Sequence, residues 1–204
     1  MPIDRNAVRR AWDAVADDYA RNRRADGEDA ALIDDLLAAL PPDARVLDVG
    51  CGDGKRTLAN LVGVEAVGLD FSRRQLELAR GTVPDARLVQ ADMTAIPLRA
   101  DSVDGITAYH AVFHVPRDQH PAVYREFARV LRPGGLVLTT VGTGRSESTR
   151  RNWMGSGKPM FWSTPGREAT RAQLEAAGFE VVWERFVDDP LGSRALFALA
   201  RLTG

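Results

Sequence analysis

Short apolar runs alternate with amphipathic stretches along most of the chain, and this alternation predicts strands and helices in turn. The runs are rich in valine and leucine, as expected for strands that are buried on both faces of a parallel sheet. The predicted elements are, in order, strand 45–49, helix 55–62, strand 65–70, helix 73–80, strand 87–91, strand 103–109, helix 119–131 and strand 135–141. Because helical crossovers between parallel strands are right-handed and pack on the sheet, we expect an α/β fold with a doubly wound sheet and helices on both faces.

Capping signals mark the ends of two helices. Ser72 and Gln75 form a capping box at the start of the helix after the second strand, and Gly81 ends that helix. A second capping box, Thr170 with Gln173, opens the last predicted helix.

Both ends of the chain add to this alternating core. Apolar residues at helical spacing predict a helix over 6–22, followed by a second helix before the first strand. At the other end, apolar runs over 179–187 and 194–202 flank a turn at 188–192 and predict an antiparallel hairpin. The sheet then has seven strands, mostly parallel with this hairpin last, in a single domain over residues 1–204.

Residues 143–166 interrupt the alternation. The segment begins with glycine, serine and arginine, and its large apolar residues are Trp153, Met154, Met160, Phe161 and Trp162. Irregular segments of this length usually form lids or binding loops, and such side chains must pack on the core, cover a ligand or meet another subunit. The preceding strand delivers the segment to the carboxyl edge of the sheet, where open α/β sheets bind ligands. We therefore expect an insertion that caps a ligand at this edge.

Three glycines alternate directly after the first strand, at positions 50, 52 and 54. Glycine permits a sharp turn through positive φ and lets a ligand lie against bare backbone. A helix from about Lys55 would point its free N–H groups back into this turn. The spacing is GxGxG, and Lys55 stands where a dinucleotide fingerprint has its third glycine. The turn therefore predicts a nucleotide-type site that differs from a nicotinamide site.

Acidic residues lie in or after the first three predicted strands. Asp48 lies within the first strand, and Asp70 ends the second, 18 residues after Gly52, where an acid can accept both hydroxyls of a ribose. Asp92 follows the third strand and could accept from an adenine amino group. Phe71 and Met93 follow these last two acids and could cover the two faces of the adenine ring. Each acid alone also fits a helix N-cap or a solvated turn, but the repetition favours a nucleotide site.

The sequence of these blocks resembles the class I S-adenosylmethionine-dependent methyltransferases, of the small-molecule type similar to methyltransferase domain 11. "GLDFS" at 68–72 is similar to their acidic loop, residues 90–115 to their third- and fourth-strand block, and 126–141 to their helix into the fifth strand. The resemblance covers 10–141 well and 165–204 more loosely. It implies a Rossmann-like seven-stranded sheet that ends in an antiparallel hairpin. It also implies in-line transfer of a methyl group from S-adenosyl-L-methionine, which leaves S-adenosyl-L-homocysteine.

The resemblance also implies which residues contact each ligand. The implied cofactor contacts are Tyr19, Asp48, Gly50, Cys51, Gly52, Asp70, Phe71, Ala91, Asp92, Met93, Tyr109 and His114. The expected acceptor contacts are Tyr109, His110, Trp153, Met160, Phe161 and Trp162. Residues 1–25 are expected to act as a partial lid through Tyr19, although a tyrosine that only packs the helix on the sheet fits equally well.

Methyl transfer from a sulfonium needs little chemistry from the protein, because the leaving group is a neutral thioether. Alignment of the acceptor alone can contribute roughly 7–11 kcal/mol. His110 is the candidate general base, because histidine as a residue type commonly exchanges protons near the operating pH, and the alternative is a polar residue that lines the pocket. His110 and His114 could share a helix face as metal ligands, but no third ligand is evident and we predict no metal. Cys51 has no second cysteine or nearby histidine, so we expect it to fill the turn rather than to react.

Composition excludes some classes of partner and leaves others open. The 204 residues include 27 basic and 28 acidic side chains, so net charge gives no reason to expect a nucleic-acid partner. One cysteine, no signal core and no membrane-spanning run favour a cytoplasmic protein with no membrane partner. We expect a small-molecule acceptor and a monomer or homodimer. The alternatives are an RNA- or protein-modifying methyltransferase, a nicotinamide-dependent oxidoreductase, which the GxGxG spacing opposes, and a non-catalytic S-adenosylmethionine-binding protein.

Overall fold

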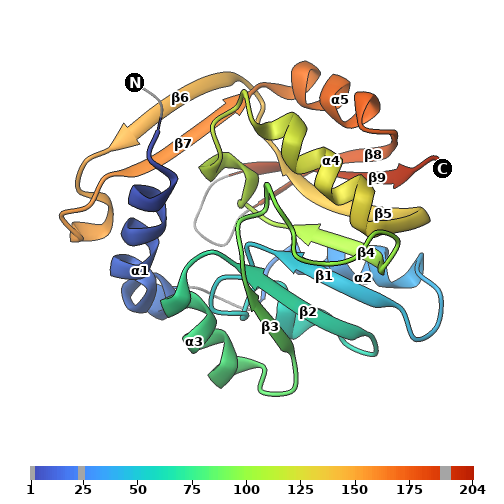
Figure 1. Cartoon of the computed structure of the whole chain (residues 1–204), viewed down its shortest axis with the longest axis horizontal. Helices are drawn as coiled ribbons and strands as arrows, with labels where there is room; N and C mark the ends of the chain where they lie inside the picture. The colour runs from blue at the N-terminus through green and yellow to red at the C-terminus, as the bar shows by residue number, and fades with distance from the viewer. Residues whose placement is uncertain (1–2, 23–25, 189–193) are drawn as a thin grey trace.

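The computed structural model describes residues 3–22, 26–188 and 194–204, and its centre is a seven-stranded sheet (Figure 1). The strands are β1 (Arg45–Val49), β2 (Glu65–Asp70), β3 (Arg87–Gln90), β4 (Val103–Ala108), β5 (Leu131–Val141), β8 (Phe179–Asp188) and β9 (Arg194–Leu202). They lie in the order β3-β2-β1-β4-β5-β9-β8. The first five pair in parallel, and β9 pairs antiparallel with both β5 and β8. The predicted fold class is confirmed.

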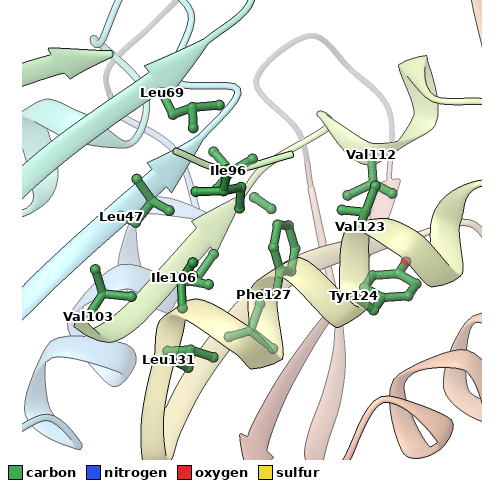
Figure 2. Packing of buried hydrophobic residues seen from close by; sticks show 14 of the residues in the cluster. Leu47, Leu69, Ile96, Val103, Ile106, Val112, Val123, Tyr124, Phe127 and Leu131 are labelled. Carbon is green, nitrogen blue, oxygen red and sulfur yellow. The ribbon is translucent and has the colours of Figure 1, made fainter. Parts of the chain in front are cut away.

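Helices cover both faces of this sheet. They are α1 (Arg5–Asn22), α2 (Ala30–Ala38), α3 (Arg73–Thr82), α4 (His120–Val130) and α5 (Arg167–Ala176). On one face α4 buries Val123 and Phe127 against Ile106 of β4 in a continuous apolar cluster (Figure 2). On the other face α2 buries Ile33 and Leu36 in a second cluster, which includes residues of β1 and β5. The strand order reverses between β1 and β4, which is the point where open α/β sheets bind ligands at their carboxyl edge.

The predicted helix 55–62 is wrong. The chain forms turns there, followed by a single 3-10 turn, η1 (Leu58–Asn60). Arg56, Thr57 and Leu58 are all buried, and three consecutive residues cannot all lie on the inner face of an amphipathic helix. Arg56 pairs with the buried Asp29, and Thr57 donates to the buried Asp48. These contacts hold both side chains inward and are incompatible with the predicted helix.

Two predicted helix ends also need correction. The last helix begins at Arg167, after Gly166 at a φ of 95°, so Thr170 lies inside α5 rather than capping it. Gly81 is likewise the penultimate residue of α3 and does not end it. Of the turn predicted at 188–192, positions 189–192 lie outside the described residues.

Residues 143–166 form a second, two-stranded antiparallel sheet instead of an irregular loop. Its strands are β6 (Arg145–Arg150) and β7 (Met160–Pro165), with a 3-10 turn, η3 (Trp153–Gly155), between them. Figure 1 shows this β6–β7 hairpin reaching from beside α5 across to α1, which both η3 and β7 contact. Every residue of β6 is exposed, so the strand has no apolar alternation by which the sequence could reveal it.

Among the helices that the structure describes, none is long and apolar enough to cross a bilayer.

Candidate active site

A cavity that opens to solvent lies at the carboxyl ends of β1, β2 and β4. Its inner wall is the turn that follows β1, and its sides are the residues after β2, β3 and β4. Helix α1 closes the outer side with Arg5, Trp12 and Tyr19. The ligand edge expected from the strand order therefore carries a defined hollow.

Most of the candidate residues meet at this cavity. Those that line it are Tyr19, Gly50, Cys51, Gly52, Asp70, Phe71, Ala91, Met93, Tyr109, His110 and His114. The candidates that do not line it are Asp48, Asp92, Trp153, Met160, Phe161 and Trp162. The lining also includes residues that the sequence analysis missed: Arg5, Trp12, Asp53, Arg56, Thr57 and Gln75. For Trp12 a signal existed, since it lies seven residues before Tyr19 on the same side of the predicted helix.

The turn after β1 brings bare backbone to the cavity. Gly50 and Gly52 have φ angles of 73° and 54°, which favour glycine. A Cβ on Gly50 would lie 2.5 Å from the Cβ of Ala111, so no side chain fits there. The N–H groups of Gly50 and Cys51 both donate to the carbonyl of Leu69, at 2.7 and 3.1 Å, which fixes the turn against β2.

Asp70 presents a carboxylate to the cavity. Its Oδ2 accepts the N–H of Gly52 at 2.9 Å, and its Oδ1 accepts the N–H of Ser72 at 2.8 Å. Burial raises the pKa of Asp70 to about 6, although these two hydrogen bonds act in the opposite direction. The carboxylate is therefore ionised at neutral pH, and its remaining lone pairs can accept hydroxyl groups of a ligand.

Asp48 lies beneath the cavity rather than in its wall. Its carboxylate is fully buried and accepts the hydroxyls of Thr57 and Thr107, the latter at 2.8 Å. Burial raises the pKa of Asp48 to about 7. Asp48 thus ties the glycine turn to β1 and β4 and supports the wall of the cavity from behind.

Asp92 is held by the first residue of α1. Its Oδ2 accepts from Arg5 Nη2 at 2.6 Å and from Arg5 Nε at 3.2 Å, while Oδ1 accepts from Thr94. The guanidinium of Arg5 also lies 5.9 Å from the centre of the Phe71 ring. Arg5 therefore lines the cavity, whereas Asp92 lies outside the lining and holds the Arg5 guanidinium.

His114 is neutral and oriented by the hairpin. Its Nδ1 lies 2.8 Å from the carbonyl oxygen of Phe161, which can only accept, so Nδ1 carries the proton. Burial lowers the pKa of His114 to about 4. This side chain therefore adds no positive charge to the cavity at neutral pH, and it leaves the site compatible with a cationic ligand.

His110 is the second residue after β4 and has a φ of 52°, and its backbone N–H donates to the hydroxyl of Thr140. This left-handed conformation interrupts any helix between His110 and His114, so the two side chains do not share a helix face. Within the described ranges, no group of three or more histidine, cysteine or acidic side chains is placed to hold a metal ion.

The large apolar residues of the hairpin pack on α1. Met160 and Phe161 are buried in one cluster with Val8 and Val15 of that helix. Trp12 of α1 also packs edge-on against Trp153 and against His114, with ring centres 5.2 Å and 5.0 Å apart, respectively. The hairpin therefore closes the site indirectly, because it supports the helix that covers the cavity.

Polar contacts fix α1 over the cavity as well. Asp13 accepts the Ser72 hydroxyl at 2.7 Å, and Arg74 donates to both oxygens of Asp17, at 2.6 and 2.9 Å. Near the other end of the helix, Lys55 donates to the carbonyl of Ala20 at 3.0 Å. Together with the Arg5 ion pair, these contacts hold α1 along its length.

Arg56, which lines the cavity, forms an ion pair with Asp29, and both side chains are nearly fully buried. The hydroxyl of Tyr109 donates to the carbonyl of Asp29 at 2.9 Å. Burial raises the pKa of Tyr109, so its hydroxyl stays protonated and serves as a structural donor.

Comparison with known proteins agrees with this geometry. A family model described as a methyltransferase domain matches residues 46–135. The chain is 46% identical over 102 residues to methyltransferase GfsG of Streptomyces halstedii, which covers 46% of this chain and 36% of that protein. It is 35% identical over 157 residues to malonyl-[acyl-carrier protein] O-methyltransferase of Enterobacter lignolyticus, which covers 74% of this chain and 60% of that protein. The chain thus spans between about a third and three fifths of the length of these curated relatives.

A solved structure covers the fold more completely. The 1,6-didemethyltoxoflavin-N1-methyltransferase of Burkholderia thailandensis, with bound 1,6-didemethyltoxoflavin and S-adenosylhomocysteine, superposes with a TM-score of 0.74. The match covers 100% of this chain and 93% of that one at 21% sequence identity, so it concerns the fold alone.

Proposed function

We propose that this chain, which belongs to the class I S-adenosylmethionine-dependent methyltransferases, transfers the methyl group of that cofactor to a small-molecule acceptor. The observation that carries the proposal is the buried Asp70 carboxylate, fixed by backbone N–H groups beside a glycine turn, at the reversal point of the sheet. A nucleoside with an amino-acid tail fits this chemistry.

The cavity offers a suitable group for each part of the cofactor. Asp70 accepts the ribose hydroxyls, and Phe71, Ala91 and Met93 supply an apolar slot for the adenine ring. The glycine turn, with Cys51, offers backbone groups to the methionine tail. Asp48 supports that turn, and Asp92 acts at the adenine end by holding Arg5.

The acceptor site lies on the other side of the methionine end, beside Tyr109 and His110. When bound, the cofactor supplies a methyl group on a sulfonium whose leaving group is a neutral thioether. The protein aligns the acceptor and excludes water, and the neutral His114 spares the sulfonium a cationic neighbour. For an acceptor that carries a proton, His110 is the proposed base, since it lines the cavity two residues after β4.

A small acceptor is favoured by how the cavity is closed. Helix α1 and the hairpin behind it cover the outer side, which leaves little access for a polymer. We propose that residues 143–166 act as the acceptor cap by holding α1 and His114, rather than by direct contact through Trp153, Met160, Phe161 or Trp162. The didemethyltoxoflavin enzyme, by its name, acts on a small molecule.

The test is a labelled-methyl screen. Purified protein is incubated with S-adenosylmethionine that carries a radioactive methyl group and with separate pools of metabolites, RNA and protein. The proposal predicts label only in the metabolite pool, and much less label with an Asp70→Ala variant at a limiting concentration of the cofactor. Label in RNA or protein would identify the alternative class of acceptor. Cofactor binding without transfer to any pool would indicate a non-catalytic binding protein.

A further inference from the structure

Gln75 carries a buried amide that the fold of the protein does not use. The side chain lies in the first turn of α3 and is 1% exposed. Both its Oε1 and its Nε2 are buried, and neither has a hydrogen-bond partner among the described protein groups. Buried polar atoms are almost always paired, so an amide with two unpaired ends requires an explanation.

The capping box that the sequence suggests is only half formed. The backbone N–H of Gln75 donates to the Ser72 hydroxyl at 3.2 Å, as such a box requires. The reverse bond, from the Gln75 side chain to the N–H of Ser72, is missing because that N–H donates to Asp70. The Gln75 side-chain amide therefore does not cap the start of its own helix.

This amide lines the cavity beside Asp70. The Oε1 atom lies 3.7 Å from the point that a Cβ on Gly52 would occupy, and the N–H of Gly52 donates to Asp70 at 2.9 Å. Gln75, Gly52 and Asp70 thus form one corner of the site. The glycine leaves this corner open, because a side chain at position 52 would narrow it.

The two side chains of the corner have complementary chemistry. An ionised carboxylate only accepts hydrogen bonds, so a hydroxyl that donates to Asp70 keeps oxygen lone pairs that need a donor. The Nε2 of Gln75 supplies a donor, and its Oε1 supplies an acceptor for a second hydroxyl. A vicinal diol satisfies both residues at once.

We propose that Gln75 is a cofactor-specificity residue, which reads the ribose diol of S-adenosylmethionine together with Asp70. The inference rests on the proposed function, because it takes the nucleoside to lie in this cavity. It also implies that the folded protein is less stable than it could be, since the amide is left unpaired for the sake of the ligand.

The first test exploits two effects of opposite sign. Gln75→Met keeps the shape of the side chain and removes both polar atoms. We expect the melting temperature without ligand to rise by about 2–4 °C, because a buried unpaired amide is lost. We expect the affinity for S-adenosylhomocysteine, measured by calorimetry, to fall roughly tenfold, as for one or two lost hydrogen bonds.

Gln173→Met is the matched control. The Oε1 of Gln173 is also buried without a partner among the described groups, but the residue lies on α5 and does not line the cavity. We expect this variant to bind S-adenosylhomocysteine as the wild type does. An equal loss of affinity in both variants would overturn the inference.

The second test locates the contact on the ligand. Wild type and Gln75→Met are titrated with S-adenosylhomocysteine and with its 2′-deoxy and 3′-deoxy analogues. If Gln75 binds a ribose hydroxyl, the difference between the two proteins should shrink for the analogue that lacks that hydroxyl. The same loss with all three ligands, or no loss with any, would overturn the inference and leave the proposed function intact. Failure of the wild type to bind S-adenosylhomocysteine would overturn both.

Discussion

Asp70 should make ligand binding in the cavity depend on pH. Its pKa is raised to about 6 by burial, and the ionised carboxylate accepts ribose hydroxyls in stronger, charge-assisted hydrogen bonds than the protonated acid does. We therefore expect the affinity for S-adenosylhomocysteine to be constant above about pH 7. Below about pH 6 it should weaken, by up to tenfold per pH unit. Calorimetric titrations between pH 5 and 8 measure this, and the weaker binding of Asp70→Asn should not follow the same curve. A flat profile for the wild type would contradict the role of Asp70.

Asp48 should influence stability rather than binding. Its pKa in the folded protein, about 7, lies above the usual value of 3.8, because the ionised form is buried. Folding therefore favours the protonated form: this contribution to stability is complete below about pH 4 and is lost as the pH rises through 7.

Asp48→Asn removes the charge and keeps an oxygen that can accept the hydroxyls of Thr57 and Thr107. The difference in unfolding free energy, variant minus wild type, should grow in favour of the variant by roughly 1.4 kcal/mol per pH unit between about pH 4 and 7. Urea unfolding at several pH values measures it. If this difference in unfolding free energy did not change with pH, burial would not raise the pKa of Asp48, and the account of this residue would be contradicted.

The residues of the site differ in how far the sequence could reveal them. Asp70 and the glycine turn follow from motif spacing, since one short segment sets their geometry. Asp48 and Asp92 could not be assigned in this way, because their partners Thr57 and Arg5 come from other segments. The sequence predicts that Gln75 completes a capping box with Ser72. Only the structure reveals that the N–H of Ser72 donates to Asp70 instead of to the side chain of Gln75.

At the scale of elements, α1 is the part of the site that can control exchange of the ligand. Its ion pair from Arg5 to Asp92 links the helix to the loop after β3, and both side chains are partly exposed. An exposed or partly exposed pair contributes up to about 1 kcal/mol. We expect Arg5→Ala to increase the dissociation rate of S-adenosylhomocysteine several-fold while changing the melting temperature little.

Arg10→Ala is the control for this element. Arg10 pairs with Asp4, just before the same helix, and so does not tie α1 to the rest of the protein. Stopped-flow measurement of Trp12 fluorescence can follow the release of S-adenosylhomocysteine from the wild type and from both variants, because Trp12 lines the cavity. Equal release rates for Arg5→Ala and Arg10→Ala would argue against a lid that depends on this ion pair.

Some helices and strands could be predicted from the sequence and others could not. The central strands of the main sheet were found because their apolar runs are buried on both sides, as β4 is throughout. The helix predicted over 55–62 failed because Arg56 and Thr57 turn inward to acids on distant segments. The β6–β7 hairpin was missed because β6 is exposed along its whole length, so its strand character depends on pairing with β7.

At the scale of the molecule, the strand order explains why these residues meet. Segments that are distant in sequence deliver Gly50, Asp70 and His110 to one edge, where the order reverses between β1 and β4. Helix α1 and the hairpin then close that edge from outside. The family and its cofactor were predictable because they depend on this shared arrangement, whereas the proposed acceptor cap, residues 143–166, has no regular pattern in the sequence.

Calorimetric titration with S-adenosylhomocysteine tests the central claim most directly, since it needs no knowledge of the acceptor. The account predicts one site per chain, micromolar affinity and no heat of binding from NAD. It also predicts that Asp70→Ala weakens binding by about 1–3 kcal/mol, or about 5- to 150-fold, through lost charge-assisted hydrogen bonds. Tight binding of NAD with no response to S-adenosylhomocysteine, or unchanged affinity in Asp70→Ala, would contradict it.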